Sequence, residues 1–325
     1  MVSITDFNAV RELAGHVRTN VCRVIVGKED LIDKLFIALV AAGHVLLHDV
    51  PGTGKTLLAK TLAKSVDCAF KRVQFTPDLL PSDLSGIYYF HPKSSEFVFR
   101  PGPLFTNILL ADEINRATPR TQSSLLECME ERQISIDGAT HALEDPFMVI
   151  ATQNPLEQQG TFPLPEAQLD RFLFRLSMGY PTREESVAIL KRFKEDEPLQ
   201  ELKAVATTEK LLQARQAAAR VYVSDEVLNY MVELAERTRK DEAVASGVSP
   251  RGCQALLKAV QVEAILQGRD FVTPDDIKRL VSSVWAHRLQ LRGTVRTRGG
   301  AEAAEEVIAR VLRDTTVPAE STAAL

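Results

Sequence analysis

The sequence lacks long hydrophobic runs and is poor in cysteine. No apolar stretch approaches the length of about 18 residues that indicates a membrane-spanning helix, and the first residues lack the basic segment and apolar core of an export signal. The wide spacing of the cysteines excludes a paired-cysteine metal motif: Cys22, Cys68, Cys128 and Cys253. Free thiols are typical of a reducing compartment, so we expect a cytoplasmic protein without a membrane span.

The sequence also lacks an excess of positive charge. Its 39 Lys and Arg residues stand against 43 Asp and Glu residues, which gives a net charge of −4. A nucleic-acid-binding domain is usually basic or carries a clustered Lys/Arg stripe, whereas here only Arg292, Arg296 and Arg298 form a short basic patch. A nucleic-acid partner is therefore not expected. The six histidines show no spacing typical of metal ligands.

The sequence does contain a glycine-rich segment between a strand signal and a helix signal. Residues 49–56 read Asp-Val-Pro-Gly-Thr-Gly-Lys-Thr, with an apolar run at 45–47 before them and helical spacing at 57–63 after them. Glycines allow successive backbone N–H groups to surround an anion, and the following helix directs the positive end of its dipole at that anion. The pattern predicts a phosphate-binding loop, although Asp49 replaces the usual first glycine. A glycine-rich turn without a ligand is the alternative.

The residues of such a loop have expected roles. Lys55 would reach the β- and γ-phosphates of a nucleoside triphosphate, and the Thr56 hydroxyl would bind Mg²⁺. The other loop residues expected to contact the nucleotide are Val50, Pro51, Gly52, Thr53, Gly54 and Leu57.

Polar residues follow two further predicted strands. The apolar run 108–111 precedes Asp112 and Glu113, and the run 147–152 leads to Asn154. Ligands of open α/β sheets bind at the carboxyl ends of strands. We therefore expect Asp112 to hold Mg²⁺ through water, Glu113 to activate the attacking water, and Asn154 to hold that water or the γ-phosphate. A solvated acidic turn and an Asn-Pro turn are the alternatives.

These motifs occur in a distinctive order together with two later ones. Leu169-Asp170-Arg171-Phe172 and Ser249-Pro250-Arg251 follow the loop, the Asp-Glu pair and the asparagine. Over about residues 20 to 290 the chain resembles the MoxR-type AAA+ ATPases. The resemblance implies ATP and Mg²⁺ as cofactors, ATP hydrolysis, and a ring, expected to be a hexamer. It also implies chaperone-like remodelling or activation of a protein partner, such as one with a von Willebrand factor A domain.

The resemblance gives roles to residues outside the loop. It places Ile25 and Val26 against the adenine ring, with ordinary core packing as the alternative. It makes Arg251 a sensor of the γ-phosphate when a lid closes. It implies that Arg171 reaches the active site of the neighbouring subunit, and the alternative is a salt bridge with Asp170 or Glu166.

The spacing of apolar residues predicts the fold class. We expect an α/β protein with a parallel, doubly wound P-loop NTPase sheet followed by an all-α lid. Strands are expected at 45–47, 72–75, 108–111, 147–152 and 172–176. The sequence also contains two inserts, a Pro/Ser/Asp-rich segment at 77–86 and an apparent hairpin at 133–143. The family resemblance implies that they face a pore or a partner, and plain surface loops are the alternative.

The expected domains are a nucleotide-binding domain with an N-terminal helix at 1–180, a helical lid without strands at 181–290, and a partly disordered C-terminal extension at 291–325. Two other functions fit the same motifs. The chain would be a nucleotide-gated binding module if slow hydrolysis only reset a conformation, or a DNA-directed or chelatase-type AAA+ motor. ATP turnover separates the first of these from the ATPase, and salt-dependent DNA binding would identify the helicase type.

Overall fold

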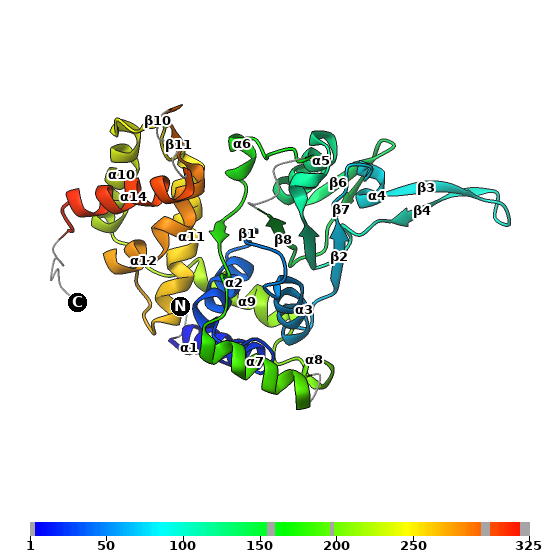
Figure 1. Ribbon diagram of the computed structural model, residues 1–325, viewed down its shortest axis with the longest axis horizontal. Helices are drawn as coiled ribbons and strands as arrows, with labels where there is room; N and C mark the ends of the chain where they lie inside the picture. The colour runs from blue at the N-terminus through cyan, green and yellow to red at the C-terminus, as the bar shows by residue number, and fades with distance from the viewer. Residues whose placement is uncertain (1–3, 155–159, 196–197, 294–299, 319–325) are drawn as a thin grey trace. The chain divides into compact units, whose positions relative to one another are not determined.

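The computed structural model describes residues 4–154, 160–195, 198–293 and 300–318 (Figure 1). Its contacts divide it into two compact units. The first unit is Glu12–Gln213, and the second contains the described residues up to Arg11 and those from Ala214 onward. The sequence placed a boundary at residue 180, and the helices that follow it, α7 (Arg183–Glu195) and α8 (Pro198–Glu201), belong to the first unit. The two units are described separately below.

A five-stranded sheet forms the centre of the first unit. Its strands run in the order β2-β5-β8-β1-β9, and every neighbouring pair is parallel. Their bounds are Phe70–Gln74, Ile108–Asp112, Met148–Gln153, Val45–His48 and Phe174–Leu176, in that order. The three central strands β5, β8 and β1 are buried over nearly their whole length, as expected for a sheet covered on both faces. The predicted parallel sheet is confirmed.

Helices pack on the sheet and fix the positions of its loops. Helix α3 (Lys55–Ser65) lies against β2 and β5, and α2 (Glu29–Val40) contacts β9. Helix α5 (Pro119–Glu131) inserts Leu125 and Leu126 into a buried cluster with side chains from β5 and β8. Because parallel strands end at the same edge of a sheet, the segments that follow β1, β5 and β8 lie close together.

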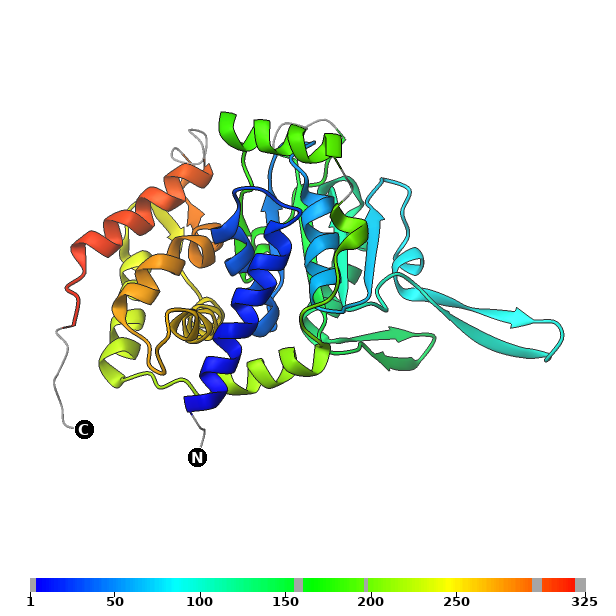
Figure 2. The same cartoon turned by 90° about the horizontal axis from the view of Figure 1, so that it is seen from below.

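Two hairpins project from the first unit (Figures 1 and 2). The predicted one is confirmed: β6 (Gln133–Ile136) and β7 (Ala139–Ala142) pair in antiparallel register. The other was not predicted. The segment at 77–86 contains the short helix α4 (Pro81–Ser85), and it leads into strands β3 (Gly86–His91) and β4 (Glu96–Pro101), which pair only with each other. The hairpins meet where His141 stacks on Phe99, with ring centroids 4.4 Å apart.

The second unit is a helical lid. It contains α10 (Asp225–Lys240), α11 (Pro250–Leu266), α12 (Pro274–Trp285) and α14 (Gly300–Asp314). Helices α11 and α12 pack closely, and the fully buried Trp285 donates its indole N–H to the carbonyl of Gly252 at 2.9 Å. Two of these helices have capped N-termini: the Ser224 hydroxyl accepts a hydrogen bond from Val227 N, and Thr273 forms a capping box with Asp276.

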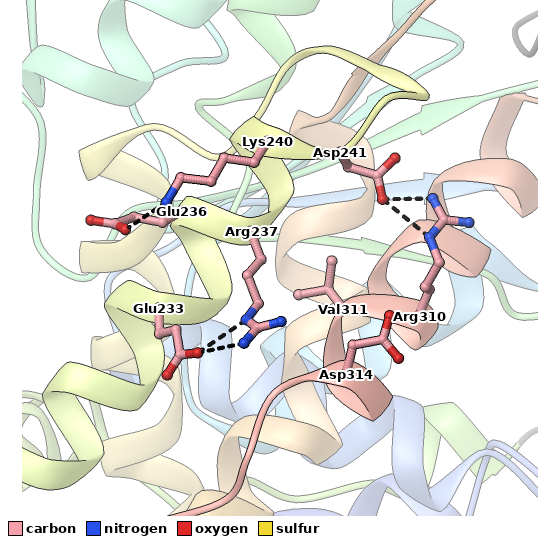
Figure 3. Close-up of a pocket in the computed structure, with 8 residues that line it drawn as sticks. All are labelled: Glu233, Glu236, Arg237, Lys240, Asp241, Arg310, Val311 and Asp314. Atoms are coloured by element: carbon pink, nitrogen blue, oxygen red, sulfur yellow. Dashed lines mark hydrogen bonds and ion pairs between the residues drawn. The ribbon is translucent and has the colours of Figure 1, made fainter.

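Other features of the second unit were not predicted. Two short strands, β10 (Val244–Ser246) and β11 (Gln290–Leu291), pair where the sequence indicated helices and loops alone. They have three and two residues, too few to produce a periodic pattern. Between α10 and α14 lies a charged cavity of about 520 Å³, spanned by ion pairs such as Arg310 with Asp241 (Figure 3).

Helix α14 packs on α10 and α12, so the part of the expected C-terminal extension that it covers belongs to the lid. Residues 319–325, expected to be frayed, lie outside the described residues. None of the helices in the described part of the chain combines the length and the hydropathy that a membrane span requires.

Candidate functional site

The glycine-rich loop joins β1 to α3, as the sequence predicted. Gly52 and Gly54 have φ values of 83° and 93°, and Gly54 is the N-cap residue of α3. These backbone conformations strain any L side chain, whereas a Cβ would find no close neighbour at Gly52 and only a 3.6 Å contact at Gly54. Glycine is therefore required here by conformation rather than by space. The loop turns directly into the N-terminus of an 11-residue helix, where backbone N–H groups are available to an anion.

The two carboxylates at the end of β5 are held by hydrogen bonds. The Thr152 hydroxyl donates to Asp112 Oδ1 at 2.6 Å and accepts from Glu113 N at 2.8 Å, so this residue of β8 links both. Glu113 has a left-handed backbone (φ 57°, ψ 50°), which is rare for a non-glycine residue and turns the chain sharply as β5 ends. Sequence reasoning identified both carboxylates but missed the role of Thr152.

Strand β2 supplies two polar side chains that the sequence analysis also missed. Arg72 donates to Asp112 Oδ2 from Nη2 at 2.7 Å and from Nε at 3.1 Å. Gln74 donates from Nε2 to Glu113 Oε2 at 2.7 Å, and Arg116 Nε lies 3.1 Å from the same oxygen. The register of β2 on β5 pairs Gln74 with Asp112, which brings the β2 side chains beside the carboxylates. The order of strands in the sheet, rather than any local motif, creates these contacts.

One cavity of about 470 Å³ gathers most of the predicted site residues. Lys55, Thr56, Asp112, Glu113 and Asn154 all line it. Its remaining lining residues are Asp49, Pro51, Gly52, Gly54, Leu57, Arg72, Gln74, Thr152 and Gln153.

Ile25 and Val26 do not contribute to the lining of this cavity. Ile25 is 5% exposed, so the structure shows it as part of the core, and a contact of these two residues with a base stays a prediction.

Asp49 has a structural role that explains its place in the loop. Asp49 is 5% exposed, and its carboxylate accepts hydrogen bonds from Ser177 Oγ at 2.8 Å, Gly179 N at 3.0 Å and Met178 N. The start of the loop is thereby fixed to the chain that leaves β9. Lys55 also contributes, because its ammonium donates to the carbonyls of Val50 at 2.7 Å and Asp49 at 3.3 Å.

Neither of the two predicted arginines is among the residues that line this cavity. Arg171, just before β9, forms an ion pair with Glu130 of α5 at 3.1 Å, and the two side chains are 28% and 30% exposed. Glu130 is a partner that the sequence did not indicate. Arg251 belongs to the second unit, where it follows Pro250 at the start of α11. The roles of both arginines stay predictions.

The residues of the cavity fit a magnesium nucleotide. Mg²⁺ favours oxygen ligands and is usually bound through one or two protein groups together with phosphates, and Thr56 and Asp112 offer a hydroxyl and a carboxylate. Within the described residues, no cluster of three or more His, Cys, Asp or Glu side chains offers an all-protein metal site. Beside the loop, burial and the nearby Arg175 lower the pKa of His48 to about 4, so this side chain is neutral at pH 7.

Comparison with known proteins agrees with this geometry. Residues 44–174 match the family described as ATPase family associated with various cellular activities (AAA), and residues 236–311 match the AAA lid domain. The chain is 41% identical over 305 residues to Chaperone MoxR1 of Mycobacterium tuberculosis, covering 91% of this chain and 80% of that protein. The chain belongs to the MoxR-type AAA+ ATPases. The predicted family is therefore confirmed.

Two further relatives match the MoxR-type chain along nearly its whole length. The protein YeaC of Bacillus subtilis is 46% identical over 311 residues, covering 96% of this chain and 97% of that protein. A crystal structure of a protein assigned as an ATPase from Cytophaga hutchinsonii superposes with a TM-score of 0.90 at 35% identity, covering 97% and 98% of the two chains. The matched AAA region contains the loop, both carboxylates, Asn154 and Arg171, and the matched lid contains Arg251.

Proposed function

We propose that this MoxR-type chain hydrolyses ATP in a Mg²⁺-dependent reaction. The observation that carries the proposal is the presence of Lys55, Asp112 and Glu113 in the lining of one cavity at the carboxyl edge of a parallel sheet. In the proposed reaction, Lys55 and the N-terminus of α3 bind the phosphates, and Thr56 and Asp112 hold Mg²⁺, which would neutralise charge on the phosphates. Glu113 accepts a proton from the attacking water, and Asn154 orients that water.

Two substitutions test the chemistry. Lys55→Ala is expected to weaken nucleotide binding, because it removes the cation that binds the β- and γ-phosphates. Glu113→Gln is expected to retain binding and to lower turnover by about 10² to 10⁴-fold, the usual contribution of a general base. Phosphate release and the binding of a fluorescent ATP analogue measure the two effects separately. Unchanged turnover in Glu113→Gln would remove the proposed base, and slow turnover with tight binding in the wild type would favour the nucleotide-gated module.

We also propose that the active form is a ring, expected to be a hexamer, in which Arg171 acts on the neighbouring subunit's ATP. The ion pair with Glu130 supports this role, because both side chains are partly exposed and solvent screening weakens the hold of such a pair on the arginine. An arginine supplied in trans contributes about 10³ to 10⁵-fold to the rate in other phosphate-transfer systems. We expect the ATPase rate per subunit to rise with protein concentration, and Arg171→Ala to bind ATP but to turn it over slowly.

Mixed rings provide the sharper test of a shared site. Arg171→Ala subunits retain Glu113, and Glu113→Gln subunits retain Arg171, so mixing two inactive variants is expected to restore part of the activity. Glu130→Gln serves as the matched control, because it breaks the same ion pair and keeps the arginine. If mixing restores nothing, or if Glu130→Gln is as inactive as Arg171→Ala, Arg171 has a structural role within its own subunit.

The proposed target is a protein client that is remodelled or activated, such as one carrying a von Willebrand factor A domain. The name of the relative Chaperone MoxR1 supports a protein client. The β3–β4 hairpin supports one as well, because its Phe90 and Phe97 are 52% and 72% exposed. A cytoplasmic location remains part of the proposal, supported by the four free cysteines.

A further inference from the structure

Strand β2 places a cation directly on the carboxylate expected to hold Mg²⁺. Side chains two residues apart on a strand share one face, so Arg72 and Gln74 point to the same side of the sheet. Arg72 donates twice to Asp112 Oδ2, and the Thr152 hydroxyl occupies Oδ1. Both oxygens of Asp112 therefore have donors from the chain itself.

The arginine side chain is more exposed to solvent than the carboxylate that it contacts. The Asp112 side chain is 14% exposed and fixed by Thr152 within the sheet, but the Arg72 side chain is 45% exposed. Strand β2 is at the edge of the sheet, so beyond Arg72 no further strand of this sheet restricts the side chain. Because the guanidinium side of this ion pair is 45% exposed and screened by solvent, the pair contributes modestly to folding stability, and stability alone does not account for the position of Arg72.

We propose that Arg72 competes with Mg²⁺ for Asp112 and thereby sets the Mg²⁺ concentration at which this site binds nucleotide. The inference rests on the proposed function of the cavity as a Mg²⁺·ATP site. Two cations beside one carboxylate repel each other, so the guanidinium on Oδ2 and a Mg²⁺ ion held by Asp112, directly or through water, weaken each other's binding. The guanidinium also donates to Gln74 Oε1 at 3.0 Å, and this second bond limits the positions it can adopt while Gln74 holds Glu113.

The test measures nucleotide binding rather than ATPase activity. A fluorescent, non-hydrolysable ATP analogue is titrated with Mg²⁺ on the full chain, and binding is followed by anisotropy. Arg72→Ala is expected to lower the half-saturating Mg²⁺ concentration by about three- to fivefold, the factor that corresponds to the upper range of an exposed ion pair. Arg72→Lys, which keeps the charge but loses the fork that contacts Oδ2 twice, is expected to lie between Arg72→Ala and the wild type.

Lys71→Ala is the matched control, since it removes one positive charge from the adjacent position of the same strand, where Lys71 Nζ donates to the Gly102 carbonyl at 3.2 Å. Lys71→Ala is expected to leave the Mg²⁺ requirement within a factor of about two, because successive side chains of a strand point to opposite faces and the exposed charge of Lys71 is screened. Equal shifts in Lys71→Ala and Arg72→Ala, or a higher Mg²⁺ requirement in Arg72→Ala, would overturn the proposal.

A double substitution tests whether Arg72 acts through Asp112. In an Asp112→Asn background, Arg72→Ala is expected to change the Mg²⁺ requirement no further, whereas a persisting shift would overturn the proposal. Failure of the proposed function looks different: the wild type would then bind no nucleotide in the presence of Mg²⁺, and both proposals would fall. Circular dichroism of Arg72→Ala checks that the exposed edge-strand substitution leaves the fold intact.

Discussion

The buried carboxylate of Asp49 leads to a quantitative prediction about the phosphate loop. Replacing Asp49 by Ala removes the acceptor for Met178 N, Gly179 N and Ser177 Oγ. The serine hydroxyl can rotate to another partner, but the two backbone N–H groups cannot. An unsatisfied buried donor costs about 1–3 kcal/mol, so the two N–H groups together are expected to lower the free energy of unfolding by about 3 kcal/mol. Asp49→Asn, which keeps one acceptor oxygen, is expected to lose about half of that.

Urea unfolding followed by circular dichroism measures these differences. Asp30→Ala is the control, because its carboxylate is 78% exposed and pairs only with Lys34 one helical turn away, so a change below about 0.5 kcal/mol is expected. Asp49→Gly is the most informative variant. This variant restores the glycine that the usual loop pattern has at this position, so the motif alone predicts no loss of stability. It nevertheless removes the three hydrogen bonds that the Asp49 carboxylate accepts. If Asp49→Ala and Asp49→Gly both unfold like the wild type, the carboxylate does not fix the loop to the end of β9.

Two further predictions concern pH and the exposed hairpin. Burial and the nearby Arg132 lower the pKa of His44 to about 3, so a proton binds this histidine more tightly in the unfolded chain than in the folded one. The contribution of neutral His44 to the free energy of unfolding is therefore fully present above about pH 6.5. It falls by up to about 1.4 kcal/mol per pH unit as the pH drops toward 3. A His44→Gln variant is expected to show a flatter stability profile between pH 6.5 and 5 in the same urea assay, and an equally steep one would exclude His44 as the cause. Phe97→Ser, at a position 72% exposed, is expected to leave the unfolding free energy within about 0.5 kcal/mol and to reduce binding of an anilinonaphthalene dye. A loss above about 1 kcal/mol would show that the hairpin packs on the body of the protein.

His44 also illustrates what a sequence does not reveal. Its ring nitrogens bridge the core, since Nδ1 accepts from Val149 N at 2.9 Å and Nε2 donates to the Met129 carbonyl at 3.0 Å. The absence of ligand spacing in the sequence excluded a metal role for this histidine. The partners are 85 and 105 residues away, and only the packing of α5 and β8 around β1 brings them together.

The three central strands of the sheet, β1, β5 and β8, were predictable because each is a short apolar run that ends at polar residues. The β3–β4 hairpin was not predicted, although its sequence is rich in aromatic residues. Its successive Ile87, Tyr88, Tyr89 and Phe90 show no alternation of apolar and polar side chains, and all of them but Tyr88 are exposed, so burial on a core does not impose a period on this strand. The segment has the amino-acid composition of a strand but lacks the alternation of apolar and polar residues. Strand prediction from sequence depends mainly on that alternation.

The residues of the candidate site also separate into those that a local sequence pattern reveals and those that only the strand order reveals. Lys55, Asp112, Glu113 and Asn154 were identified because each follows a strand at a position where chemistry and local pattern coincide. Arg72 was not, because its sequence neighbours describe only an ordinary edge strand. Its contact with Asp112 follows from β2 lying next to β5, which is a property of the strand order and of no local segment. Polar residues at the ends of strands can therefore be found one segment at a time, whereas a side chain that contacts them from an adjacent strand is found only from the strand order. For Arg72, the strand order adds a prediction that the sequence alone did not give, namely competition between this arginine and Mg²⁺ for Asp112.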